Sequence, residues 1–116
     1  MRTVMTAVVL GCLAIVGGVV QVYAAEVKGE VIDTYCYASM GAKGEAHRSC
    51  AIACAKKGIP MGLLEDGTGK VYVLVPSKPA TSLPIAVTDK MAQKVTINGK
   101  VYRIGGSQFL AVESIE

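Results

Sequence analysis

The sequence predicts a small, mainly β domain: a closed barrel of five or six short strands with an inserted cysteine-bearing helix and a second short helix. Two observations carry this prediction. Short runs rich in β-branched residues recur between glycine-containing turns, and one well-bounded helical segment interrupts them. A chain of 116 residues allows one domain with a modest core.

The first strand is expected over residues 26–33, "EVKGEVID", where apolar and polar residues alternate. Residues 61–76 contain two apolar runs around a glycine-containing turn and predict a hairpin. The second short helix is expected within residues 82–93, "SLPIAVTDKMAQ", where a serine and a proline suit its start.

A second hairpin is expected over residues 94–104, "KVTINGKVYRI". Asn98-Gly99 between β-branched runs is typical of a two-residue type I′ turn. "GGS" then turns the chain into a final strand that begins near Gln108, which we expect to pair with the strand that begins near Val27.

The inserted helix is expected over residues 44–58, "GEAHRSCAIACAKKG". Gly44 is a plausible N-cap, and Lys56 and Lys57 suit the negative end of the helix dipole. Gly58 is placed to end the helix.

The first 24 residues predict a secretory signal peptide. Arg2 supplies a positive charge, residues 8–20 are apolar, and "VYA" at 22–24 has the small residues of a cleavage site. We therefore expect a single mature domain over residues 25–116 in the periplasm or secreted from the cell. Two alternatives stay open, an uncleaved N-terminal membrane anchor and lipidation at Cys12.

Composition argues against nucleic acid as a partner. The formal net charge is only +3, the bases are scattered, and the chain has no tryptophan and one phenylalanine.

Residues 33–58 hold three of the four cysteines and the only histidine. Spacings of three and four place His47, Cys50 and Cys54 on one side of the predicted helix. Cys36 is expected in an extended segment, followed by a glycine-containing loop that folds back over that side. Three thiolates and one imidazole suit zinc, cuprous copper or an iron–sulfur cluster. The candidate metal ligands are therefore Cys36, His47, Cys50 and Cys54.

Two other uses of these thiols stay open. Cys36 could form a disulfide with Cys50 or Cys54, a staple that contributes about 3 kcal/mol and leaves one thiol over. Thiol–redox chemistry is the other, although the CxxC of thioredoxin-like proteins and the CxxCH of c-type haem proteins are absent.

For each of four neighbours of the cluster, the sequence allows one role at the metal site and one ordinary structural role. Asp33 either accepts a hydrogen bond from His47 or a loop amide, or caps the end of the first strand. Arg48 is suited to offset thiolate charge or to lie exposed on the helix. Met40 and Met61 are candidate copper ligands, although filling gaps in the core is the commoner role of methionine.

The pattern D-x-x-C … H-R-x-C-x-x-x-C over residues 33–54, followed by "KGIPMGLLED", resembles a group of small exported bacterial proteins with an oligonucleotide/oligosaccharide-binding (OB) type of fold. The resemblance extends over nearly all of residues 26–116. It implies an OB-like barrel with the cysteine-bearing helix inserted after the first strand, and it implies no particular activity.

The sequence thus favours an exported binding or accessory module, rather than an enzyme, that holds a transition metal. The first alternative is a disulfide-stapled OB-like domain that binds a small ligand, peptide or glycan. The second alternative is a thiol-redox or electron-transfer protein. The partner would be a protein or a small molecule, with membrane contact only through the N-terminal segment if it is retained.

Overall fold

The computed structural model describes residues 18–116. Arg2, Cys12 and most of the predicted apolar run lie outside the described residues, so the structure does not test these parts of the signal-peptide prediction. Within residues 18–116, no helix is long and apolar enough to cross a membrane.

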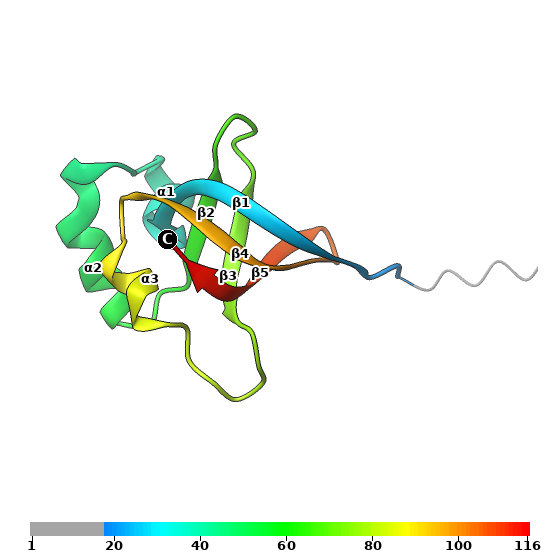
Figure 1. Cartoon of the computed structure of the whole chain (residues 1–116). Helices are drawn as coiled ribbons and strands as arrows, with labels where there is room; N and C mark the ends of the chain where they lie inside the picture. Colours follow the sequence, from blue (N-terminus) through cyan, green and yellow to red (C-terminus); the bar gives the residue numbers. More distant parts are fainter. Residues whose placement is uncertain (1–17) are drawn as a thin grey trace, which may run out of the picture.

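The described chain forms a closed five-stranded barrel in the order β1-β2-β3-β5-β4 (Figure 1). β3 and β5 are parallel, and the other neighbouring strands are antiparallel. This arrangement confirms the prediction of a small, mainly β, OB-like barrel. The strands are β1 (Gln21–Asp33), β2 (Met61–Glu65), β3 (Val71–Pro76), β4 (Lys94–Ile104) and β5 (Ser107–Ile115).

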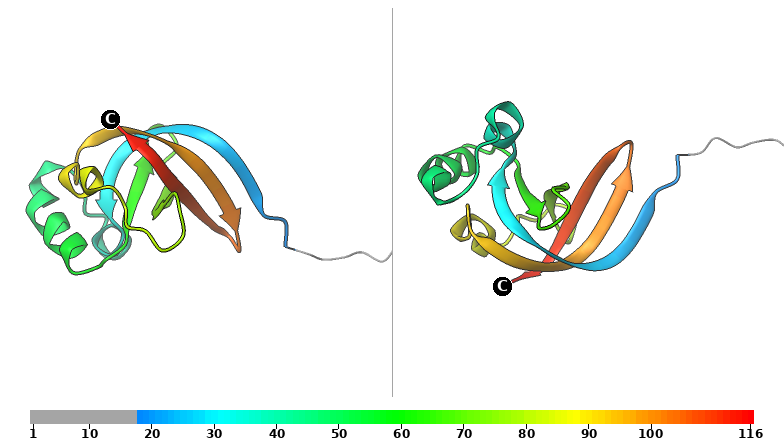
Figure 2. Two further views of the ribbon diagram at one scale, coloured as in Figure 1. Left: turned by 60° about the horizontal axis from the view of Figure 1, so that its bottom comes forward. Right: turned by 90° about the horizontal axis from the view of Figure 1, so that it is seen from above.

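The helices gather at one end of the barrel, whereas β1 begins at the other end (Figure 2). Between β1 and β2 lie α1 (Thr34–Met40), a short 3-10 turn η1 (Glu45–His47) and α2 (Arg48–Lys56). The inserted cysteine-bearing helix is therefore confirmed. The second short helix, α3 (Ile85–Asp89), lies between β3 and β4 and is shorter than the predicted segment.

The prediction of a hairpin turn at Asn98-Gly99 is wrong. Both residues lie inside β4, where they pair with β1 on one side and β5 on the other, and the register shifts between them as in a β-bulge. A Cβ on Gly99 would lie 1.9 Å from the carbonyl oxygen of Ala111. Glycine is thus required here for close backbone approach rather than for a positive φ.

The real turn between β4 and β5 is Gly105-Gly106, where φ is 58° and 78°. Positive φ at both central residues suits a two-residue hairpin. β5 then pairs with β4 and β3, so the expectation that it pairs with the first strand is also wrong. In the closed barrel β5 lies between β3 and β4, and the two neighbours of β1 are β2 and β4.

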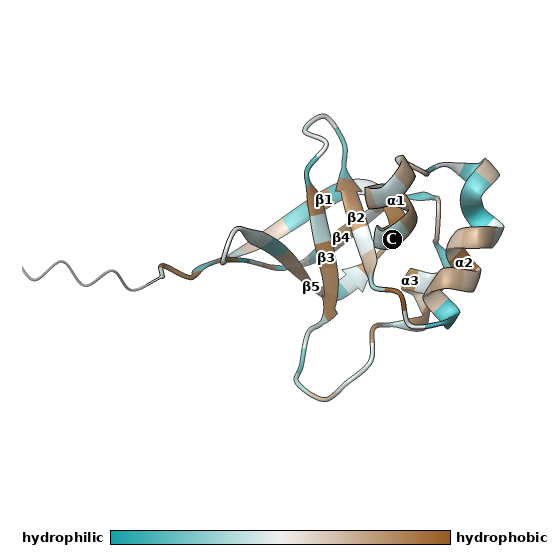
Figure 3. Ribbon diagram, turned by 180° about the vertical axis from the view of Figure 1, so that it is seen from behind, coloured by the Kyte–Doolittle hydropathy of each residue, from teal (hydrophilic) through white to brown (hydrophobic). Residues whose placement is uncertain are grey.

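The core lies inside the barrel and beneath α2 and α3. Figure 3 shows hydrophobic residues along the strands and over part of α2. Ala51 of α2 and Val87 of α3 are buried in the same cluster as the strand residues, so both helices pack on the barrel. The largest fully buried apolar side chains are Leu63, Met91, Ile97, Leu110, Val31, Val87, Val101 and Val112.

β1 begins before the predicted cleavage site. Residues 21–24 pair with Arg103, Tyr102, Val101 and Lys100 of β4. Cleavage after Ala24 stays a prediction, and it would remove this outer part of the β1–β4 ladder.

The close contact at Gly99 gives a test of the barrel. Gly99→Ala is expected to lower the free energy of unfolding by about 1–3 kcal/mol, because the new methyl group meets the Ala111 carbonyl and the strands must separate. Urea denaturation of the variant and the parent measures the difference.

The matched control is Lys100→Ala, an exposed position next along the same strand. It should change the free energy of unfolding by less than about 0.5 kcal/mol. Equal stability of the two variants would contradict the close approach of β4 and β5.

Candidate metal centre

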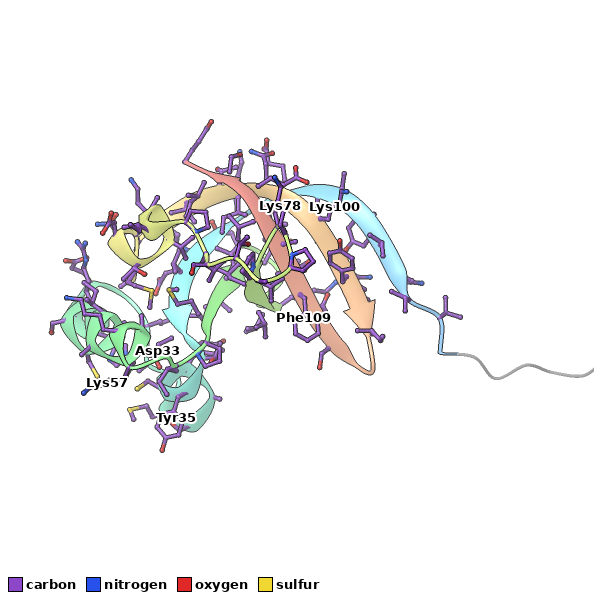
Figure 4. All side chains as sticks on the ribbon, turned by 90° about the horizontal axis from the view of Figure 1, so that it is seen from below. Asp33, Tyr35, Lys57, Lys78, Lys100 and Phe109 are labelled. Atoms are coloured by element: carbon purple, nitrogen blue, oxygen red, sulfur yellow. The ribbon has the colours of Figure 1, made fainter. Side chains whose placement is uncertain are left out.

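The candidate centre begins where β1 ends, at Asp33. This residue is 1% exposed, and its Oδ1 accepts the backbone N–H of Cys36 at 2.8 Å, which makes it the N-cap of α1. Cys36 therefore lies in a helix, and the expectation of an extended segment is wrong. Figure 4 shows Asp33 at the helical end of the barrel, with Tyr35 pointing away from it.

The chain returns to the centre through a short glycine-containing loop. α1 ends at Gly41, which adopts φ 68° and donates its N–H to the carbonyl of Tyr37. Three residues later the N–H of Gly44 donates to Oε2 of Glu30, a buried carboxylate of β1, at 2.7 Å. This hydrogen bond fixes the loop against the barrel just before η1 and His47.

α2 supplies two cysteines. Cys50 and Cys54 lie one turn apart, and Ala51 between them is 1% exposed and faces the core. Packing of Ala51 sets the rotation of the helix, which leaves Cys50 exposed and Cys54 half-buried beside α1. α2 ends at Lys56; two residues later Gly58 adopts a φ of 90°, and the N–H of Ile59 donates to the carbonyl of Cys54.

The structure brings all four predicted residues to one place, in two overlapping groups. The ligand atoms of Cys36, His47 and Cys50 lie within 4.8 Å of one another. Those of Asp33, Cys36 and Cys54 do the same. The buried thiol of Cys36 belongs to both groups and is thus the centre of the cluster.

Asp33 is charged and doubly hydrogen-bonded. Its Oδ2 lies 2.9 Å from Nε2 of His47. Burial alone would raise the pKa of Asp33, but the hydrogen bonds from the Cys36 amide and from His47 outweigh it, so this pKa lies below its usual value. Asp33 therefore fills both roles considered from the sequence, as a cap and as a partner of His47.

Two of the thiols are held in the protonated form in the absence of an ion. Burial and the nearby Asp33 carboxylate raise the pKa of Cys36 to about 12. Burial and Asp33 also raise the pKa of Cys54. A cation that binds here must displace these protons, and its charge then offsets both the thiolates and Asp33.

The donor set fits a soft metal ion. The three cysteines of the described chain are unpaired, and sulfur and imidazole donors approach one another from three segments of chain. Sulfur-rich sites of this kind select zinc, cuprous copper or iron–sulfur clusters over hard cations such as magnesium.

The other predicted neighbours point elsewhere. Nη2 of Arg48 donates to the carbonyl of Asp89 at 3.0 Å and so joins α2 to α3 rather than facing the sulfurs. Met61 accepts a hydrogen bond from Thr88 through its sulfur, and Met40 is 69% exposed.

Comparisons with protein-family models, curated proteins and solved structures find no match for this chain. Functional interpretation therefore rests on the chemistry and geometry of the cluster itself.

The different environments of the thiols predict an order of alkylation. In the reduced, metal-free protein, iodoacetamide should modify the exposed Cys50 first and Cys36 last. Cys36 is 5% exposed, and its raised pKa leaves little thiolate near neutral pH. Peptide mapping by mass spectrometry at successive times measures the order.

Denaturation in guanidinium should remove the difference, which controls for the intrinsic reactivity of each peptide. Equal rates for Cys36 and Cys50 in the folded protein would show that Cys36 is not enclosed as described.

Proposed function

We propose that this protein is a small binding or accessory module that holds a transition metal ion through Cys36, His47, Cys50 and Cys54. The barrel supplies a rigid end against which α1 and α2 present these side chains. The proposal describes binding and not catalysis.

One observation carries the proposal: the sulfur of Cys36 lies within 4.8 Å of the ligand atoms of His47 and Cys50 in one group, and of Asp33 and Cys54 in the other. Burial of ionisable groups costs free energy unless they are paired or ligated. A bound cation would compensate the buried carboxylate of Asp33, the buried thiol of Cys36 and the half-buried thiol of Cys54.

Zinc, cuprous copper and an iron–sulfur cluster all suit the donors. A tetrahedral zinc site would use three thiolates and the imidazole. Cuprous copper accepts fewer ligands of the same soft type, and a cluster would use the thiolates alone. The expected content is about one ion, or one cluster, per chain.

The central place of Cys36 predicts unequal effects of substitution. Cys36→Ser should abolish metal binding because this thiol belongs to both ligand groups. Cys50→Ser and Cys54→Ser, which each belong to one group, should weaken binding at least about tenfold. Chelator competition with Zn²⁺ and with Cu⁺, together with elemental analysis of reduced protein, measures the affinities.

Ser49→Ala is the matched control, because this exposed α2 residue lies outside both groups and should leave binding unchanged. Circular dichroism checks that each variant is folded. Reduced wild-type protein that contains no metal and takes up neither ion would end the proposal. A chain mass lower by two hydrogens, together with a count of one free thiol, would instead support the disulfide staple.

Thiol–disulfide exchange is a second candidate function, favoured by one pair of thiols. Cys50 is exposed near the start of α2, and buried Cys36, with its pKa of about 12, lies within 4.8 Å of it. An exposed attacking thiol beside a buried partner suits exchange with a substrate disulfide. Reduction of a model disulfide that is lost in Cys50→Ser would support this function over metal binding.

We also propose export, with cleavage after Ala24. The charged, apolar and small-residue regions of the first 24 residues support it. Protein recovered from its host should have an intact mass that corresponds to a chain beginning at Ala25. A full-length, membrane-bound form as the main species would contradict cleavage.

A further inference from the structure

Asp33 contacts both halves of the cysteine–histidine centre. Its Oδ1 accepts the N–H of Cys36 at 2.8 Å, and its Oδ2 lies 2.9 Å from Nε2 of His47. The side chain of Asp33 is completely buried, whereas that of His47 is 17% exposed. One carboxylate thus joins the helix that carries the central thiol to the turn that carries the imidazole.

We infer that Asp33 is the positioning residue of the metal centre: it fixes the start of α1 beneath Cys36 and holds His47 in the tautomer whose Nδ1 is free to bind the ion. This inference rests on the proposed function, because a fixed tautomer matters only if the imidazole is a ligand.

The tautomer follows from simple hydrogen-bond chemistry. The two oxygens of Asp33 face two nitrogen atoms, the backbone N–H of Cys36 at 2.8 Å and Nε2 of His47 at 2.9 Å, and a carboxylate can only accept. Nε2 of His47 must then carry the proton. In the neutral ring the lone pair lies on Nδ1, on the other side of the imidazole. Metal-bound histidines commonly donate their second N–H to a carboxylate in this way.

Asp33 acts as a positioning residue rather than as a ligand, although its oxygen lies close to Cys36 and Cys54. Both of its oxygens already accept hydrogen bonds, and one of them caps α1. Ligation through Oδ1 or Oδ2 would compete with the cap or with His47 for that oxygen.

Asp33→Asn separates the two roles. An asparagine is as good an N-cap as an aspartate, so its single oxygen should keep the hydrogen bond from the Cys36 N–H. Its NH₂ group must then face Nε2 of His47. A donor in that place requires Nε2 to accept, which moves the proton to Nδ1 and blocks the lone pair that would bind the ion.

The first readout is the tautomer of His47, from the ¹⁵N shifts of the ring in the reduced, metal-free protein. Spectra are compared at a pH where the imidazole has lost its second proton. The wild type should be protonated on Nε2, and Asp33→Asn should be protonated on Nδ1. A purely structural role of Asp33 would not exchange the two tautomers.

The second readout is the affinity for Zn²⁺ and, separately, for Cu⁺. Asp33→Asn should bind about 10- to 100-fold more weakly than the wild type. Asp66→Asn is the matched control, because it removes one carboxylate charge from an exposed turn residue whose partner is Lys94. It should leave both the tautomer and the affinity unchanged. Circular dichroism checks the fold.

Three results would overturn the inference: a wild-type ring protonated on Nδ1, an unchanged tautomer in Asp33→Asn, or a changed tautomer with affinity within about twofold of wild type. In each case the wild type still binds metal and the proposed function survives. Failure of the wild-type protein to bind either ion is a distinct result, which removes the proposed function and the positioning role together.

Discussion

The barrel closes because one strand hydrogen-bonds along both of its edges. β1 pairs with β4 over its first ten residues and with β2 from Gly29 onward, so the two ladders overlap at Gly29 and Glu30. A Cβ on Gly29 would lie 2.1 Å from the carbonyl oxygen of Leu64. The absence of a side chain therefore permits the close approach on which closure depends.

The same strand delivers the centre. Because β1 continues through the barrel wall to Asp33, a carboxylate arrives in a buried place at the end of the barrel. It is stabilised there by the Cys36 amide and by His47. The chain is also fastened at the next residue, where the N–H and hydroxyl of Thr34 both donate to the carbonyl of Pro60. The start of α1 is thereby tied to the segment that follows α2.

The centre combines a rigid side with an accessible side. Asp33 and Cys36 are enclosed by the barrel and the helices, whereas Cys50 is exposed on α2. An ion held here would be fixed from within and reachable from solvent through the Cys50 side. The exposed thiol beside the enclosed one also explains why thiol exchange is the chemically nearest alternative.

Local sequence was sufficient for the barrel class, for the helix that carries Cys50 and Cys54, and for the membership of the cluster, because these depend on short-range periodicity and composition. It was insufficient at Asn98-Gly99 and at Cys36. Glycine suits a turn and a bulge equally, and only the Ala111 backbone across the sheet decides between them. The helix around Cys36 depends on Asp33 as its N-cap. Aspartate is a common N-cap, but Tyr35 and Tyr37 on either side of Cys36 favour an extended segment, so the sequence supported both structures. The pairing of Asp33 with His47, fourteen residues away, was decided by the tertiary structure alone. It requires the loop before His47 to fold back against β1, where the N–H of Gly44 donates to the carboxylate of Glu30.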